Sequence, residues 1–126
     1  MKYLLLSYTP IAEWDSSDTP SEDALEAFAI YEKFQTELMA SGEFVAAEGL
    51  GHPSMSRTLR KQADAVVVSD GPFAELKEVL ASYAVIDCSG YDRAVEIARQ
   101  VVAAIGDTVE IRPILGEDFV ESAARP

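Results

Sequence analysis

The chain has 126 residues and a mass of 13.7 kDa, the size of one domain that can bury a core without disulfides or metal. Its 22 acidic and 10 basic residues give a formal charge of −12 and a pI of about 4.3. Because affinity for phosphate backbones and anionic membranes comes from Lys and Arg, this charge argues against nucleic acid and membranes as partners.

The first segments predict a strand followed by a loop. Residues 2–8 are apolar at both alternating sets of positions, which is typical of a central strand covered on both faces. Residues 9–18 contain proline, serines and Trp14 and are expected to form a loop. Trp14 either covers a pocket or anchors this loop by packing.

A long helix and a second strand come next. Thr19-Pro20-Ser21-Glu22 has the form of a capping box and predicts a helix start, with Thr19 as the N-cap. Gly42 predicts a left-handed end of that helix near Ser41. Residues 44–50 are then expected to form the second strand.

The middle of the chain predicts a hairpin and a rigid corner. Short strands are expected at 58–60 and 65–69, turning near residues 62–64. The corner at Asp70–Phe73 combines a turn-forming aspartate, a glycine and a proline, so it is stiff. One or two helical turns are predicted over residues 75–80.

The last third predicts a strand, a helix and a final strand. The strand at 82–88 is again apolar on both faces. Ser89 is expected to cap the second helix, and Gly106 to end it. Residues 108–115 are expected to form the last strand, and 116–126 a loose acidic tail after a single domain of residues 1–115.

Removing the small hairpin leaves the order βαββαβ, so we predict an α+β, ferredoxin-like fold with an inserted short hairpin. In that fold two helices cover one face of an antiparallel sheet. The central strands are nevertheless apolar on both faces, so the open face needs a cover. A second copy, packed sheet against sheet, is the economical cover, and we expect a homodimer.

Several charged residues gather around the corner and predict a polar pocket. A carboxylate pair at low dielectric can support acid–base chemistry, and an arginine can hold a substrate carboxylate bidentately. The alternative is a salt-bridged network that only fixes the corner. The catalytic candidates are Asp70 and Glu75, and the ligand-binding candidates are Glu48, Arg60, Lys77 and Tyr83.

The remaining chemistry-bearing residues indicate neither a cofactor nor a metal. His52 is the only histidine, so a Ser–His or Cys–His catalytic arrangement has no second candidate histidine. For the same reason no pair of histidines has the spacing of metal ligands. His52 either lies on a surface loop or lines the pocket. A cation site with Glu48, His52, Asp70 and Glu75 is only weakly supported, and we expect no metal. No glycine-rich phosphate loop precedes a helix.

The single cysteine and the apolar opening bear on location. Cys88 cannot form an intrachain disulfide, and its surroundings indicate a small buried hydrophobic side chain. The run Tyr3–Leu6 is too short for a signal-peptide core and far shorter than the ~20 residues that span a bilayer. We therefore expect a cytoplasmic protein.

The segment Asp70-Gly71-Pro72-Phe73-Ala74-Glu75-Leu76-Lys77-Glu78 closely resembles the signature of the DGPF proteins within the YCII-related family. The resemblance extends over about residues 1–115. It includes Met1–Tyr8, Ser41–Leu50, Thr58–Arg60, Tyr83–Asp87 and Val109–Ile114. It implies a dimeric α/β barrel built from ferredoxin-like subunits.

The same resemblance bears on activity. Some members of the family carry a histidine–aspartate pair in a pocket, with the histidine near the start of the first helix. Residues 21–31 of this chain contain no histidine. Members similar to this chain often accompany extracytoplasmic-function sigma factors, which implies a regulatory setting.

Two functional hypotheses therefore stay open. The first is a small-molecule-binding or regulatory module, whose acidic surface could also meet a basic protein partner. The second is an enzyme that uses acid–base chemistry on a small polar metabolite near the corner.

Overall fold

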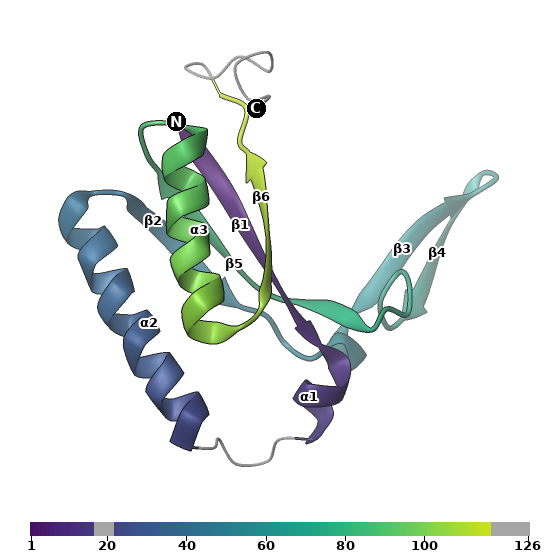
Figure 1. The fold of residues 1–126 in the computed structure, drawn as a ribbon. Helices are drawn as coiled ribbons and strands as arrows, with labels where there is room; N and C mark the ends of the chain where they lie inside the picture. Colours follow the sequence, from purple (N-terminus) through teal and green to yellow (C-terminus); the bar gives the residue numbers. More distant parts are fainter. Residues whose placement is uncertain (17–21, 117–126) are drawn as a thin grey trace.

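Four strands form one antiparallel sheet in the computed structural model, which describes residues 1–16 and 22–116 (Figure 1). In spatial order they are β2 (Phe44–Gly49), β5 (Glu78–Asp87), β1 (Lys2–Pro10) and β6 (Thr108–Pro113). Strand β1 is antiparallel to both of its neighbours, and β2 is antiparallel to β5. This α+β architecture is compatible with the predicted ferredoxin-like fold.

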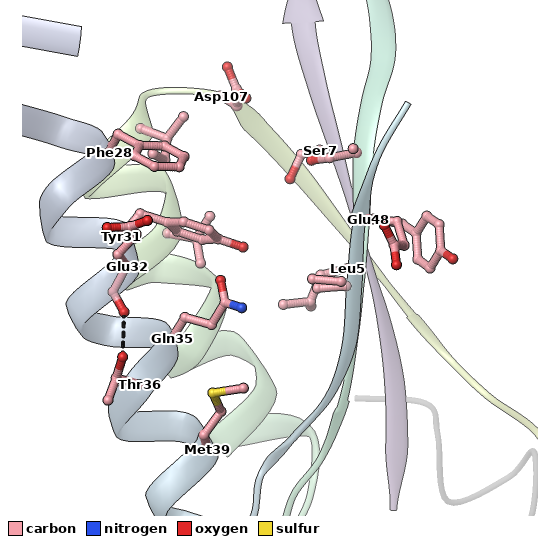
Figure 2. A pocket seen from close by; sticks show the side chains of 17 residues that line it. Leu5, Ser7, Phe28, Tyr31, Glu32, Gln35, Thr36, Met39, Glu48 and Asp107 are labelled. Atoms are coloured by element: carbon pink, nitrogen blue, oxygen red, sulfur yellow. Dashed lines mark hydrogen bonds between the residues drawn. The ribbon is translucent and has the colours of Figure 1, made fainter. Parts of the chain in front are cut away.

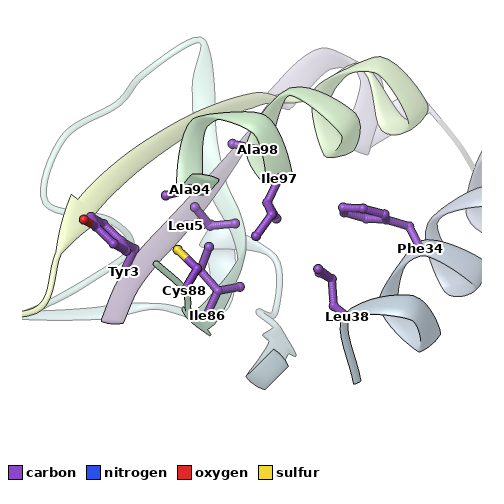
Figure 3. Packing of buried hydrophobic residues seen from close by; sticks show 9 residues of the cluster. All are labelled: Tyr3, Leu5, Phe34, Leu38, Ile86, Cys88, Ala94, Ile97 and Ala98. Carbon is purple, nitrogen blue, oxygen red and sulfur yellow. The ribbon is translucent and has the colours of Figure 1, made fainter. Parts of the chain in front are cut away.

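Two long helices, α2 (Glu22–Ser41) and α3 (Tyr91–Ile105), cover the same face of the sheet (Figure 1). Alternate residues of the central strands face them, and these side chains form the core with residues from both helices (Figure 3). The buried residues are Tyr3, Leu5, Phe34, Leu38, Ile86, Cys88, Ala94, Ile97 and Ala98. Within the part of the chain that the structure describes, no helix covers the opposite face of the sheet.

Glycines end both long helices, as predicted. Gly42 and Gly106 have φ of 82° and 88°, in the left-handed region that glycine adopts without steric cost. The predicted cap Ser89 is wrong, because the Gly90 carbonyl accepts the first helical hydrogen bond, from the Ala94 N–H at 3.1 Å. The helix therefore starts one residue later, and no side chain caps it.

The segments around the first strand differ from the prediction. Residues 9–10 continue β1, and a short helix α1 (Ile11–Ser16) replaces the expected loop. The predicted helical turns over 75–80 are also wrong, since β5 already begins at Glu78. Both differences have one cause: Thr9 and Pro10 pair with Val79 and Glu78 beyond a bulge.

Three other boundaries concern the chain ends and the capping box. The last strand ends at Pro113, before the expected residue 115, and the Ile114 N–H then donates to the Lys2 carbonyl. The capping residues Thr19 and Pro20 lie outside the described residues. The predicted loose tail lies outside them too, except for residue 116.

The predicted hairpin is confirmed as β3 (Arg57–Gln62) and β4 (Ala65–Asp70), preceded by a 3₁₀ turn at Pro53–Met55. It forms its own two-stranded sheet and projects away from the main one (Figure 1). The register places Leu59, Val66 and Val68 on one face, where all three side chains are exposed.

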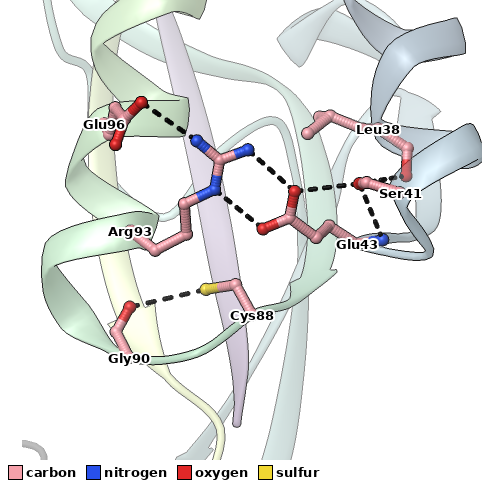
Figure 4. Close-up of polar contacts among 7 residues, drawn as sticks. All are labelled: Leu38, Ser41, Glu43, Cys88, Gly90, Arg93 and Glu96. Atoms are coloured by element: carbon pink, nitrogen blue, oxygen red, sulfur yellow. Dashed lines mark hydrogen bonds and ion pairs between the residues drawn. The ribbon is translucent and has the colours of Figure 1, made fainter.

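A partly buried ion pair joins Glu43, the residue before β2, to Arg93 of α3 (Figure 4). The Arg93 guanidinium donates from Nε and Nη2 to the two carboxylate oxygens of Glu43, both at 2.8 Å. The Ser41 hydroxyl adds a third hydrogen bond to this carboxylate at 2.9 Å. These bonds, with Arg93 first, hold the Glu43 pKa below its ordinary value.

Candidate functional site

A cavity of about 590 Å³ lies between the sheet, α2 and the C-terminal end of α3 (Figure 2). Phe28, Tyr31, Gln35 and Met39 line it from α2, and Leu5 faces them from β1 (Figure 2). The full lining is Leu5, Ser7, Phe28, Tyr31, Glu32, Gln35, Thr36, Met39, Ala47, Glu48, Gly49, Ser82, Tyr83, Ala84, Val101, Ile105 and Asp107. Apolar walls with a few polar groups are typical of small-molecule sites.

The helical side of the cavity is incompletely packed. Phe34 and Leu38 of α2 reach the core, whereas Phe28 and Met39 line the cavity and are more than half exposed. Ala47 and Ala84 are paired on the neighbouring strands β2 and β5, and both point to the same face of the sheet. Their small side chains fill little of the space on this side of the cavity. The hollow therefore arises from small residues on the strands opposite large residues on the helix.

Asp107 stands at one end of the cavity (Figure 2). It follows Gly106, whose left-handed conformation turns the chain out of α3. The pKa of the Asp107 carboxyl is raised, mainly by burial. A hydrogen bond with the Thr9 side chain lowers this pKa, and the charges of Glu13 and Glu78 raise it further. This is a half-buried carboxylate among acids.

The cavity wall carries charge of one sign. None of the residues that line it is Lys, Arg or His. Its acidic residues are Glu32, Asp107 and Glu48, and the Glu48 side chain points away from α2. Tyr31 contributes a phenol whose pKa is raised by burial. Within residues 1–16 and 22–116, no three His, Cys, Asp or Glu side chains are grouped so as to hold a metal ion.

Two of the sequence-predicted ligand residues, Glu48 and Tyr83, lie opposite each other on β2 and β5. Both belong to the sheet wall of the cavity. The Glu48 side chain lies on the side of the sheet away from α2, whereas Leu5 points toward the helix (Figure 2). Tyr83 shares the face of Glu48, because directly paired residues point the same way.

The other predicted residues lie at the hairpin and the corner, and none of them lines the cavity. Asp70 pairs with Arg57 at 3.5 Å, and both side chains are largely exposed. The Arg60 guanidinium lies over the Phe73 ring, 5.5 Å from its centroid. Glu75 and Lys77 are exposed. The structure thus places Glu48 beside Tyr83 and the other four candidates outside the cavity.

A second hollow, of about 620 Å³, lies where the hairpin meets the sheet, and it is mostly apolar. His52 lines it, accepts a hydrogen bond from the Ser54 N–H at 3.1 Å, and so caps the 3₁₀ turn. The Trp14 ring packs edge-to-face against His52 at 5.2 Å. Trp14 therefore anchors the segment after β1, and His52 has a structural contact as well as a place in the wall.

Sequence reasoning missed Gln35 and Asp107 as site residues. Asp107 had a usable signal: an acidic residue directly after a helix-ending glycine lies near the negative end of the helix. No pattern in the sequence showed that Thr9 and Glu13 would be its neighbours.

No helix within the described residues is long and apolar enough to cross a membrane. An uncharacterized protein of Rhizobium meliloti (strain 1021) is 35% identical over 82 residues, which are 64% of this chain and 66% of the length of that relative. Residues 1–118 match the YCII-related domain. The chain therefore belongs to the YCII-related family.

Proposed function

We propose that this protein is a small-molecule-binding module, suited to a regulatory role, and that its ligand occupies the cavity between the helices and the sheet. The observation that carries this proposal is the cavity of about 590 Å³, whose walls are mainly apolar and also present polar groups. Phe28 and Met39 expose apolar surface there that a ligand would cover.

Binding is better supported than acid–base catalysis. The candidate acid–base residues Asp70 and Glu75 are exposed at the corner and do not line the cavity. A carboxylate in open water lacks the burial and the nearby charges that adapt a side chain to acid–base catalysis. The cavity itself offers hydrogen-bonding groups, among them Ser7, Tyr31 and Gln35, that can orient a ligand.

The proposal includes a cytoplasmic homodimer of the DGPF subgroup, with the open sheet faces packed together as a dimeric barrel. On the helix-free face the register places Leu4 and Leu6 of β1 beside Val85 and Tyr83 of β5. All four are half-buried in a single chain. The hairpin supports the same conclusion, because it exposes Leu59, Val66 and Val68 and an isolated two-stranded hairpin is marginally stable in water. A free, buried Cys88 suits a reducing compartment.

The test uses a neutral fluorescent probe, 2-(1-naphthyl)ethanol, titrated with the protein. Wild-type protein is expected to bind it saturably. Ala47→Leu narrows the cavity from the sheet side and is expected to weaken binding about tenfold or more. Ala40→Leu is the matched control, because Ala40 is exposed on α2 and does not line the cavity.

Two outcomes would overturn the proposal. One is the absence of saturable binding to wild-type protein at millimolar probe. The other is equal loss of binding in both variants, since the probe would then bind elsewhere. Melting temperatures of both variants show whether each is folded.

A further inference from the structure

The charges around the helix–sheet cavity are one-sided. Its charged lining residues are all acidic, and Asp107, at the mouth, is the most enclosed of them. The described charges that act on Asp107 belong to Glu13 and Glu78, which are acidic as well. A negative ligand group at this end would meet like charges at reduced dielectric, which is unfavourable.

The end of α3 adds to the negative potential. The aligned peptide dipoles of a helix place partial negative charge at its C-terminus, where the last carbonyls lack helical partners. Helix α3 ends at Ile105, which lines the cavity, and its last turn contains no basic residue. Asp107 therefore lies beside a helix end that attracts cations.

The walls next to Asp107 suit an apolar body with a positive end. Phe28 and Tyr31 project from α2 on the side that faces the cavity (Figure 2). Aromatic faces attract cations through the ring quadrupole, and more strongly where water is excluded. Met39 and Val101 extend the apolar surface of the wall.

We propose that the ligand of this cavity is a hydrophobic ammonium ion, with its apolar body against α2 and its protonated amine at the Asp107 carboxylate. The inference rests on the proposed function, because it names the ligand class of the same cavity. An ammonium group donates up to three hydrogen bonds, and Asp107 and the hydroxyl of Ser7 supply acceptors at the sheet end.

The experiment compares three probes with the same ring and a two-carbon chain. They are 2-(1-naphthyl)ethylamine, which is cationic, 2-(1-naphthyl)ethanol, which is neutral, and 1-naphthaleneacetic acid, which is anionic. Dissociation constants are measured at pH 7 by fluorescence or calorimetry. The amine is expected to bind at least about tenfold tighter than the alcohol, and the acid at least about tenfold weaker than the amine.

Two single-charge variants separate a local effect from the acidity of the whole protein. Asp107→Asn is expected to reduce the amine-to-alcohol preference to about twofold. Asp64→Asn changes the net charge equally, but Asp64 is exposed in the hairpin turn, so the preference should persist. Saturable alcohol binding by Asp107→Asn, together with its melting temperature, shows that the cavity is intact.

The outcomes distinguish this inference from the proposed function. If the alcohol binds as tightly as the amine, or if both variants lose the preference equally, the ammonium assignment is refuted while the cavity remains a binding site. If none of the three probes binds saturably, both are refuted. An acid that binds more tightly than the amine would reverse the assigned charge.

Discussion

Replacement of Glu43 by glutamine tests how much the ion pair between Glu43 and Arg93 stabilises the fold. Glu43→Gln keeps the shape of the side chain and removes its charge. The amide oxygen of the glutamine can still accept a hydrogen bond from Arg93. The amide NH₂ group would face a guanidinium N–H, and two donors cannot form a hydrogen bond with each other. The change therefore removes one charge-assisted bond and weakens the other.

The expected loss of unfolding free energy follows from these contacts. Hydrogen bonds to charged groups contribute about 1.5–3 kcal/mol each when they are shielded from water. Glu43 and Arg93 retain 17% and 31% of their side-chain exposure, so solvent screening favours the lower part of that range. We expect a loss of about 2 kcal/mol, which corresponds to a fall in melting temperature of roughly 8 °C at this chain length.

The assay is chemical denaturation at several pH values, with Glu96→Gln as the matched control. Glu96 also pairs with Arg93, at 3.1 Å, but it is 62% exposed, and its loss should cost less than about 0.5 kcal/mol. The Glu43 pKa is depressed below 4.5 in the folded protein, so its contribution is fully present above that pH and is lost as the pH falls through the folded pKa. The difference between wild type and Glu43→Gln should shrink accordingly.

Equal effects of the two substitutions would refute this reasoning, because burial would then not determine the strength of the pair. A difference between wild type and Glu43→Gln that stays constant down to pH 3 would refute it as well, since the charge of Glu43 would then not be the cause.

Two further substitutions test the helix end and the dimer. Gly106→Ala should lower the free energy of unfolding by about 1 kcal/mol in the same denaturation assay, because a side chain disfavours the left-handed φ of 88°. Gly49→Ala is the control and should cost little, because an added Cβ meets no atom within 4 Å at either position and Gly49 has no left-handed φ. Leu6→Glu should convert the proposed homodimer to a monomer, as measured by light scattering, whereas Leu115→Glu, beyond the sheet, should leave it dimeric. A monomeric wild type or a dimeric Leu6→Glu would contradict the proposed interface.

Local chemistry made much of the fold predictable. Gly42 and Gly106 predicted both helix ends, because few other residues adopt the conformation that a left-handed cap requires. The central strands β1 and β5 were predictable from apolar residues at both alternating sets of positions. The prediction of the N-cap of α3 was wrong by one residue, because Gly90 and not Ser89 is the N-cap.

Long-range pairing explains the remaining failures. Residues 75–80 have a helix-compatible local sequence, but part of this segment extends β5 because Pro10 and Thr9 lie beside it. The candidate site failed to form one group for the same reason, since Glu48 and Arg60 belong to different sheets. The cavity depends on the distance between α2 and the sheet, and no periodicity in a single segment reports that distance.

The most direct test of the proposed binding site is an amide chemical-shift titration of the ¹⁵N-labelled protein with 2-(1-naphthyl)ethanol. Saturable shifts are expected, centred on residues of the cavity wall, among them Ser7, Tyr31, Ala47 and Ser82. Shifts confined to the hairpin at residues 57–70, or no saturable shifts at all, would contradict the proposed site.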